Sequence, residues 1–183
     1  MTRPAAGKAT RNAAAVLVAT MLPLASSPIA WAVDLHPRGP TDVGWRVQRV
    51  VDGDTISVTR AGQRLRVRLL GIDSPETVRP DSPVECFGPQ ATAFARQALE
   101  GRVVTLEFDP SQGLRDRFGR TLAYVWTSDP SPRLFNREAV ATGMAREYTY
   151  AGRPYAWQRE FRLAQAQAKG VSLGLWGACP LRP

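Results

Sequence analysis

The order of the elements that the sequence predicts is that of an α+β protein built mainly from a β-barrel. Strand-like runs joined by tight-turn signals occupy residues 45–71, a helical segment follows at 88–100, and two further strand-like runs lie between 102 and 126. Five strands with a helix between the third and the fourth have the element order of the OB-fold, a small barrel. A length of 183 residues suits one such domain with a packed core.

The first three strands are predicted to form a meander. Residues 45–51 end at the Asp-Gly pair at 52–53, which is a strong signal for a hairpin turn. Residues 55–60 are rich in β-branched side chains, and Ala61-Gly62 turns the chain again. Residues 64–71 alternate, with leucine and valine on one face and mostly arginine on the other, as in a strand with one buried face.

A helix is predicted at residues 88–100, because Pro89 suits the first turn of a helix and Gly101 ends it. The remaining elements are two strands and two helices, predicted at residues 102–108, 120–126, 132–142 and 154–169. The sequence therefore predicts a five-stranded barrel with three helices.

The first 32 residues have the composition of an export signal. Basic residues precede an apolar stretch at 13–25, and Ala30-Trp31-Ala32 is a small-x-small cleavage site. The alternative is a membrane anchor, but the apolar run is shorter than the roughly 20 residues that span a bilayer. We predict a secreted protein that is cleaved after Ala32 and has no membrane contact afterwards. A flexible polar leader at 33–43 would precede a single domain at 44–183.

The charge balance favours a polyanionic partner. The chain has 24 basic and 16 acidic side chains, a formal net charge of +8. Removal of the signal would take away three basic residues and leave 21 basic and 16 acidic ones, so the mature chain would stay positive. Nucleic acid is such a polyanion. A basic surface with no partner is the alternative, and charge alone does not exclude it.

Two cysteines, Cys86 and Cys179, are present. An even number of cysteines in an exported protein predicts a disulfide, here between the segment before the first helix and the end of the chain. Two free buried thiols are the alternative. Two cysteines and one histidine do not make a closed structural zinc site.

Three short stretches contain the residue types of one active site: DGDT at 52–55, RLLGIDSPE at 68–76 and DRFGR at 116–120. They supply carboxylates, whose hard oxygens bind calcium, a further carboxylate that can act as a base, and arginines that can bind phosphate in a bidentate way. Each residue alone has an ordinary alternative, such as a turn aspartate, a cap before Ser74-Pro75, or a solvated arginine on a strand. Their occurrence together favours the active site.

The order and spacing of these stretches resemble the staphylococcal nuclease (thermonuclease) family, from about residue 45 to residue 176. The resemblance implies an OB-type barrel with three helices. It implies that the carboxylates of Asp54 and Asp73 and the backbone carbonyl of Ser74 bind Ca²⁺, although the family more often has threonine at that third position. Asp52 would lie behind these ligands and orient water or the turn.

The same resemblance implies the catalytic groups. Glu76 would be the general base that deprotonates water, and Arg68 and Arg120 would hold the scissile phosphate and stabilise the transition state. The family usually has tyrosine in place of Phe118, so a contact made by that hydroxyl is missing here. The residues expected to contact substrate are Arg117, Phe118, Tyr148 and Tyr150. For the two tyrosines, packing in the core or rim is an equal alternative.

The only histidine, His36, lies in the predicted leader, which argues against nucleases that need a catalytic histidine. The implied function is that of a secreted, calcium-dependent nuclease that acts as a monomer. It would hydrolyse DNA and RNA, preferably single-stranded, with little sequence preference, and would leave 3′-phosphate ends. One alternative is a non-catalytic nucleic-acid-binding module of the same fold. Another is an interaction domain of the cell envelope.

Overall fold

The structure is a computed structural model, and it describes residues 1–2, 36–77, 83–128 and 131–179. Contacts divide the chain into residues 1–33 and a compact unit from residue 34 onward. The predicted export signal and its cleavage site fall almost wholly outside the described residues. Among the described residues, no helix is both long enough and apolar enough to span a membrane.

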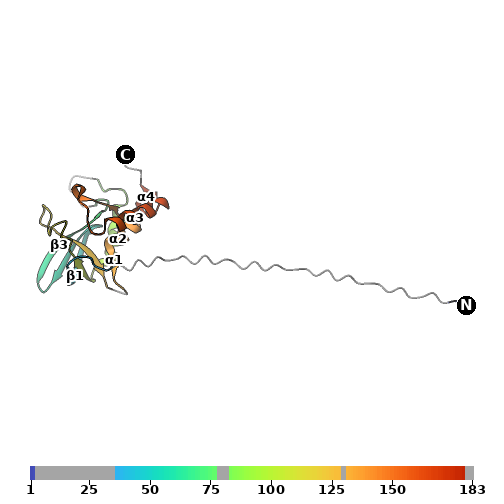
Figure 1. Cartoon of the computed structure of the whole chain (residues 1–183), viewed down its shortest axis with the longest axis horizontal. Coiled ribbons are helices and arrows are strands. Elements are labelled where there is room, and N and C mark those ends of the chain that lie inside the picture. Colours follow the sequence, from blue (N-terminus) through green and yellow to red (C-terminus); the bar gives the residue numbers. More distant parts are fainter. Residues whose placement is uncertain (3–35, 78–82, 129–130, 180–183) are drawn as a thin grey trace. The chain divides into compact units, whose positions relative to one another are not determined.

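Strands form a closed barrel in the order β3-β2-β1-β5-β6, with β7 added beside β6 (Figure 1). The barrel closes because β3 also pairs with β6, in parallel, through residues 67–69 and 121–123. The strands are β1 (Thr41–Asp52), β2 (Thr55–Arg60), β3 (Gln63–Leu69), β5 (Val103–Glu107), β6 (Thr121–Thr127) and β7 (Arg133–Leu134). This confirms the predicted five-stranded OB-fold barrel, and the second strand has the predicted bounds.

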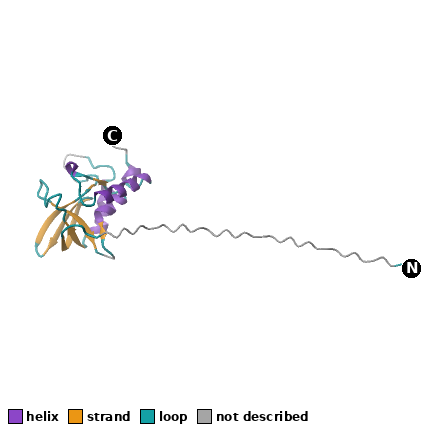
Figure 2. Cartoon of the chain, in the orientation of Figure 1, coloured by secondary structure: helices purple, strands orange, loops and turns teal. Residues whose placement is uncertain are grey.

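The α-helices lie together on one side of the strands (Figure 2). They are α1 (Gly88–Leu99), α2 (Phe135–Ala141), α3 (Gln158–Gly170) and the short α4 (Leu175–Ala178). The three longer helices confirm the prediction of three helices beside the barrel. α1 contacts β1, and α2 contacts β6 and α3. The core is formed by fully buried side chains such as Val58, Val67, Tyr124 and Phe161.

Two helices begin later than predicted. The second was predicted from residue 132, but residues 133–134 pair with β6 as β7. The third was predicted from residue 154, but Tyr155 and Trp157 are buried in a loop before the helix. Proline at 132 and at 154 suits the first turn of a helix, but here each lies in non-helical chain that precedes the helix. α4 was not predicted.

The first strand begins at Thr41, four residues earlier than predicted, because Thr41 and Asp42 pair with β5. The preceding backbone is also held by the domain. The amides of Arg38 and Gly39 donate to the carboxylate of the fully buried Glu107, over 2.6 and 3.0 Å. The predicted leader at 33–43 therefore overlaps the barrel, and its last residues are part of the fold.

A buried carboxylate predicts how stability depends on pH. Asp109 is 4% exposed and accepts hydrogen bonds from the hydroxyl of Tyr124 and the amide of Ala156, both over 2.8 Å, and from the amide and hydroxyl of Ser111. Burial alone would raise the pKa of Asp109, but these hydrogen bonds outweigh burial and lower it. The folded state therefore binds this proton less readily than the unfolded chain does.

The stabilisation from Asp109 should be complete above the ordinary aspartate pKa of about 3.9 and should be lost as the pH falls through the lowered folded pKa. As the pH falls from neutral to about 3, we expect the Asp109→Asn variant to lose less unfolding free energy than the parental protein does. Urea unfolding at a series of pH values measures this. Parallel curves for the two proteins would contradict it.

Candidate active site

A cleft of about 660 Å³ opens where the β1–β2 turn, the end of β3 and the loop before β6 come together. All the metal-binding, catalytic and substrate-binding residues predicted from the sequence line it. They are Asp52, Asp54, Arg68, Asp73, Ser74, Glu76, Arg117, Phe118, Arg120, Tyr148 and Tyr150. The structure thus gathers residues that lie nearly 100 positions apart in the chain.

The β1–β2 turn is held against the segment that follows β3. The backbone amide of Asp54 donates to the carboxylate of Asp52 over 3.0 Å, and Asp54 in turn accepts the amide of Ser74 over 3.0 Å. A Cβ atom at Gly53 would lie 2.7 Å from the side chain of Ser74, so only glycine allows this close approach. The turn therefore fixes Asp54 beside residues 73 and 74.

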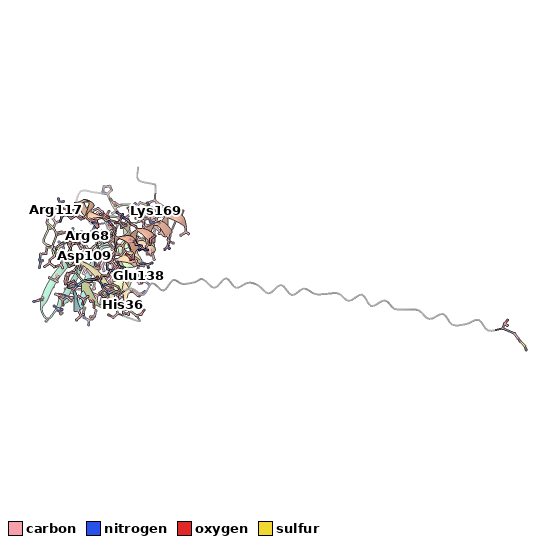
Figure 3. The ribbon with its side chains drawn as sticks, in the orientation of Figure 1. His36, Arg68, Asp109, Arg117, Glu138 and Lys169 are labelled. Carbon is pink, nitrogen blue, oxygen red and sulfur yellow. A yellow bond between two sulfur atoms is a disulfide. The ribbon has the colours of Figure 1, made fainter. Side chains whose placement is uncertain are left out.

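The guanidinium of Arg68 lies between two carboxylates. Its Nη2 is 3.2 Å from Asp54 and 3.5 Å from Asp73, and its Nη1 donates to the carbonyls of Leu69 and Ile72, each over 2.7 Å. Figure 3 labels Arg68, from β3, and Arg117, from the loop before β6. The carboxylates of Asp54 and Asp73 therefore lie close together in the cleft, on either side of one guanidinium nitrogen.

Negative charge is crowded at this position. Burial and the nearby charge of Asp54 raise the pKa of Asp52 to about 7. The same two causes raise the pKa of Asp73, against the opposing effect of Arg68. Hard carboxylate oxygens that converge and repel each other suit a calcium ion, which would relieve the repulsion. Among the described residues, however, no group of three or more carboxylate, histidine or cysteine side chains forms a ready metal cluster.

Arg120 is fixed by the loop that carries it. Its Nε donates to Asp116 over 2.7 Å, and its backbone amide donates to the same carboxylate over 2.9 Å. Burial alone would raise the pKa of Asp116, but its bonds with Arg120 lower it. The Nη1 atom of Arg120 lies 3.4 Å from the hydroxyl of Thr55, which donates to Asp54 over 3.0 Å. A chain of polar contacts therefore links the arginine to the carboxylates.

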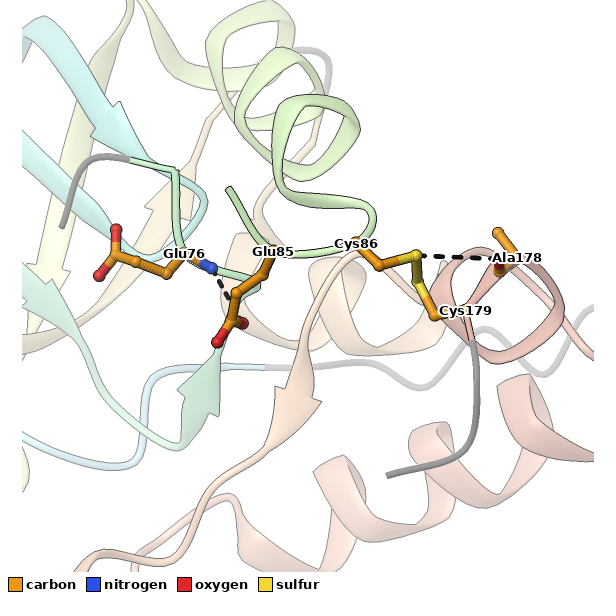
Figure 4. Close-up of a disulfide and its surroundings, with 5 residues drawn as sticks. All are labelled: Glu76, Glu85, Cys86, Ala178 and Cys179. Carbon is orange, nitrogen blue, oxygen red and sulfur yellow. Dashed lines mark hydrogen bonds between the residues drawn. A yellow bond between two sulfur atoms is a disulfide. The ribbon is translucent and has the colours of Figure 1, made fainter. Parts of the chain in front are cut away.

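Two hydrogen bonds tie the backbone of Glu76 to Glu85, and Figure 4 shows one of them. The amide of Glu76 donates to the carboxylate of Glu85 over 3.2 Å, and the amide of Glu85 donates to the carbonyl of Glu76 over 2.9 Å. The next residue, Cys86, forms a disulfide with Cys179, with a Cα–Cα distance of 5.9 Å. This confirms the predicted disulfide and places it beside the segment that carries Glu76.

Aromatic side chains form the rim of the cleft. Phe118 is 68% exposed, and the guanidinium of Arg117 lies 4.7 Å from its ring. Tyr148 and Tyr150 are also exposed, with ring centroids 6.4 Å apart. Exposure of both tyrosines favours contact with a ligand over packing in the core.

A small second sheet positions these tyrosines, and the sequence did not predict it. The strand β4 (Ile72–Asp73) pairs with β8 (Arg146–Glu147), and the amide of Tyr148 donates to the carbonyl of Gly71 over 2.9 Å. Tyr155 supports the same segment, because its hydroxyl donates to Glu147 over 3.0 Å. Strands of two residues have no periodicity that could reveal them.

Some residues of the cleft were not predicted. Asp116 lines the cleft and stands in a stretch singled out from the sequence, so the residues around it could have pointed to it. Thr55 stands in another of these stretches and supports the cleft from outside its lining, through contacts with Arg120 and Asp54. Tyr155 and Glu85 carry no such signal, because only the folded chain brings them to the cleft.

Comparison with known proteins gives the family. A family profile described as "Staphylococcal nuclease homologue" matches residues 66–178. The chain is 40% identical over 133 residues to a thermonuclease of Staphylococcus hyicus, with 72% of this chain and 75% of the relative covered. The chain belongs to the staphylococcal nuclease family.

Two further relatives support membership of the staphylococcal nuclease family. A thermonuclease of Staphylococcus intermedius is 39% identical over 142 residues, which cover 76% of this chain and 81% of the relative. Endonuclease YncB of Bacillus subtilis is 34% identical over 131 residues, which cover 71% of this chain and 60% of the relative. The profile begins within β3, so it includes Arg68, Glu76 and Arg120, whereas the turn with Asp54 precedes it.

Proposed function

We propose that this chain is a secreted, calcium-dependent nuclease that cleaves DNA and RNA with little sequence preference and leaves 3′-phosphate ends. Membership of the staphylococcal nuclease family makes it a nuclease, a hydrolase of phosphodiester bonds in nucleic acids. The observation that supports the detailed proposal most is the single cleft that holds Asp54, Asp73, Glu76 and two arginines together.

The carboxylates of Asp54 and Asp73 and the backbone carbonyl of Ser74 would hold the calcium ion. Bound there, calcium supplies positive charge that polarises the phosphoryl group and neutralises its oxygens. Two carboxylates and a carbonyl form a site of low charge, comparable to extracellular calcium sites with dissociation constants of roughly 10⁻⁴–10⁻³ M. Burial and the nearby charge of Asp54 raise the pKa of Asp73, and a cation bound beside the two carboxylates would offset both effects.

The two arginines would bind the scissile phosphate. Arg120 is pre-oriented by Asp116, and Arg68 by two backbone carbonyls, so little ordering is needed when substrate binds. Their fixed donors would stabilise the charge that develops on the phosphoryl oxygens in the transition state.

Glu76 would act as the general base. It would take a proton from the attacking water, which forms the new oxygen–phosphorus bond while the bond to the 5′-oxygen breaks, and the leaving 5′-oxygen would take up a proton from solvent to become a hydroxyl. The carboxylate is held in place, because its Oε1 accepts the amide of Thr77 over 3.0 Å. Breakage on the 5′ side leaves the phosphate on the 3′ end.

Exposed rings at the rim explain the proposed preference for single strands. Tyr148, Tyr150 and Phe118 present faces on which unpaired bases can stack, and stacking accepts every base. Phe118 can stack as tyrosine would, but it has no hydroxyl with which to contact a phosphate. Backbone charge together with stacking gives little sequence preference.

Export and a monomeric state complete the proposal. A disulfide persists in an oxidising compartment, so the Cys86–Cys179 bond supports a location outside the cytoplasm. A fluorescent tag on the chain would report secretion, and sedimentation would report the monomer.

We predict that an excess of chelator abolishes digestion of single-stranded DNA and that added calcium restores it at high micromolar to millimolar concentrations. Asp54→Asn should raise the calcium concentration needed for half-maximal rate, because it removes a charged ligand. The measurement is the initial rate across a calcium titration.

Two outcomes would contradict the proposal, and an assay of the products checks the cleavage site. Full activity in excess chelator would reject calcium dependence. Binding of DNA without cleavage at any calcium concentration would favour the non-catalytic binding module. Treatment of the products with a 3′-phosphatase, followed by extension with a polymerase, checks which end carries the phosphate.

A further inference from the structure

Strand β3 carries a row of arginines on one face. Successive side chains of a strand point to opposite faces, so Arg64, Arg66 and Arg68 share a face. Val67 and Leu69 point the other way and are fully buried in the barrel core. The arginine row therefore lies on the outer face of the barrel.

Only one end of this row belongs to the cleft. Arg68 lines the cleft, whereas Arg66 and Arg64 are exposed and lie beyond its lining. Successive arginines are about 6.6–6.8 Å apart along the strand, since each residue advances a strand by about 3.3–3.4 Å. The row thus continues from the proposed phosphate clamp across the open face of the barrel.

The neighbouring strands extend the basic face. Thr59 of β2 stands between Arg64 of β3 and Arg46 of β1. Ser57, two residues earlier, stands in the same way between Arg66 and Arg49 of β1. The residues between the arginines are thus short and carry hydroxyl groups that can donate to an anion.

Arg68 pairs with Asp54 and Asp73, but the neighbouring strands offer no such partner to the other two arginines of the row. β2 and β3 contain no aspartate or glutamate, and Asp42 of β1 is paired with Arg60. Within the part of the chain that the structure describes, Arg64 and Arg66 take part in no ion pair. Their charge is available to a partner from outside the chain.

We infer that Arg66 and Arg64 form a track for the sugar–phosphate backbone of the substrate strand, leading away from the scissile phosphate at Arg68. The inference rests on the proposed function and adds the place where the flanking nucleotides bind. A groove of positive charge that follows the backbone is a common way to bind single strands, and OB-folds bind oligonucleotides on this part of the barrel. Contacts to phosphate add affinity without reading sequence.

The track predicts that long strands bind better than short ones. A dinucleotide has one phosphate, which Arg68 and Arg120 would hold, and it would not reach Arg66 or Arg64. A single strand of a dozen or so nucleotides would occupy both. The parental protein should therefore have a lower KM for the long strand, and the difference should shrink as salt is added.

The test is the double variant Arg64→Gln/Arg66→Gln. Its matched control is Arg137→Gln/Arg159→Gln, which removes the same charge from α2 and α3. For the long strand we expect KM to rise about tenfold in the track variant, and we expect the slope of log affinity against log salt to become shallower by roughly 1.4, from two lost phosphate contacts. Cleavage of the dinucleotide should be unchanged.

Each other outcome overturns the track. An equal effect in the control variant would mean that only net charge matters, and an equal loss on the dinucleotide would place the two arginines in the catalytic centre. If KM and the salt slope did not change, Arg64 and Arg66 would not contribute to binding of the substrate strand. Binding of a fluorescent oligonucleotide to the same variants is measured without catalysis, so the track is tested even if the parental chain cleaves nothing and the proposed function fails.

Discussion

Replacement of Glu76 by glutamine is expected to lower kcat for single-stranded DNA by at least about a hundredfold, because general-base catalysis typically contributes 10²–10⁴ in rate. Glutamine has nearly the same shape, and its amide oxygen can still accept the hydrogen bond from Thr77. The variant should therefore keep the fold and the affinity for substrate and lose only the proton acceptor. Rates at saturating substrate and calcium measure the effect.

The control is Glu138→Gln in α2, the same change at a half-buried glutamate that does not line the cleft. It should leave kcat unchanged. Arg68→Ala and Arg120→Ala should produce losses of about 10²–10³, because each removes a charged donor to the transition state. If Glu76→Gln digested DNA at the parental rate, Glu76 would not be the base, whatever the variants of the arginines did.

The barrel could be predicted because its signals are local. The hairpin turn predicted from the Asp-Gly pair at 52–53 is present, with Gly53 and Asp54 as its loop residues, and the alternation in β3 matches its one buried face. Strand ends were predicted less well, because pairing with other strands sets them. Thr41 belongs to β1 because it pairs with β5. Residues 133–134 form a strand because they pair with β6.

The candidate site shows the same division. The stretches singled out from the sequence, and the family resemblance that they carry, were enough to name eleven of the residues that line the cleft. How they are held was not readable from the sequence, because it depends on contacts between distant segments. Examples are the hydrogen bond from the amide of Ser74 to Asp54, the support of Tyr148 by Gly71 and the contact of Arg120 with Thr55.

Loss of the disulfide is expected to destabilise the chain strongly. The bond joins residues 93 positions apart, and a chain-entropy estimate for a loop of this length is about 4–5 kcal/mol. For a protein of this size the melting temperature should fall by roughly 10–20 °C. The double variant Cys86→Ser/Cys179→Ser and the reduced parental protein should agree, and calorimetry measures both. A fall of less than about 3 °C would contradict the estimate.

The same bond should affect catalysis, because Cys86 directly follows Glu85, whose carboxylate holds the amide of Glu76 (Figure 4). Freed from Cys179, the segment that carries the proposed base should populate more conformations, and fewer of them would place Glu76 correctly. We therefore expect a lower kcat at temperatures well below the melting temperature. KM for long strands should change little, because the arginines proposed to bind them lie elsewhere. Measurement at about 20 °C separates this effect from unfolding, since most of the variant is then still folded. An unchanged kcat at that temperature would show that the disulfide stabilises the fold without positioning the base.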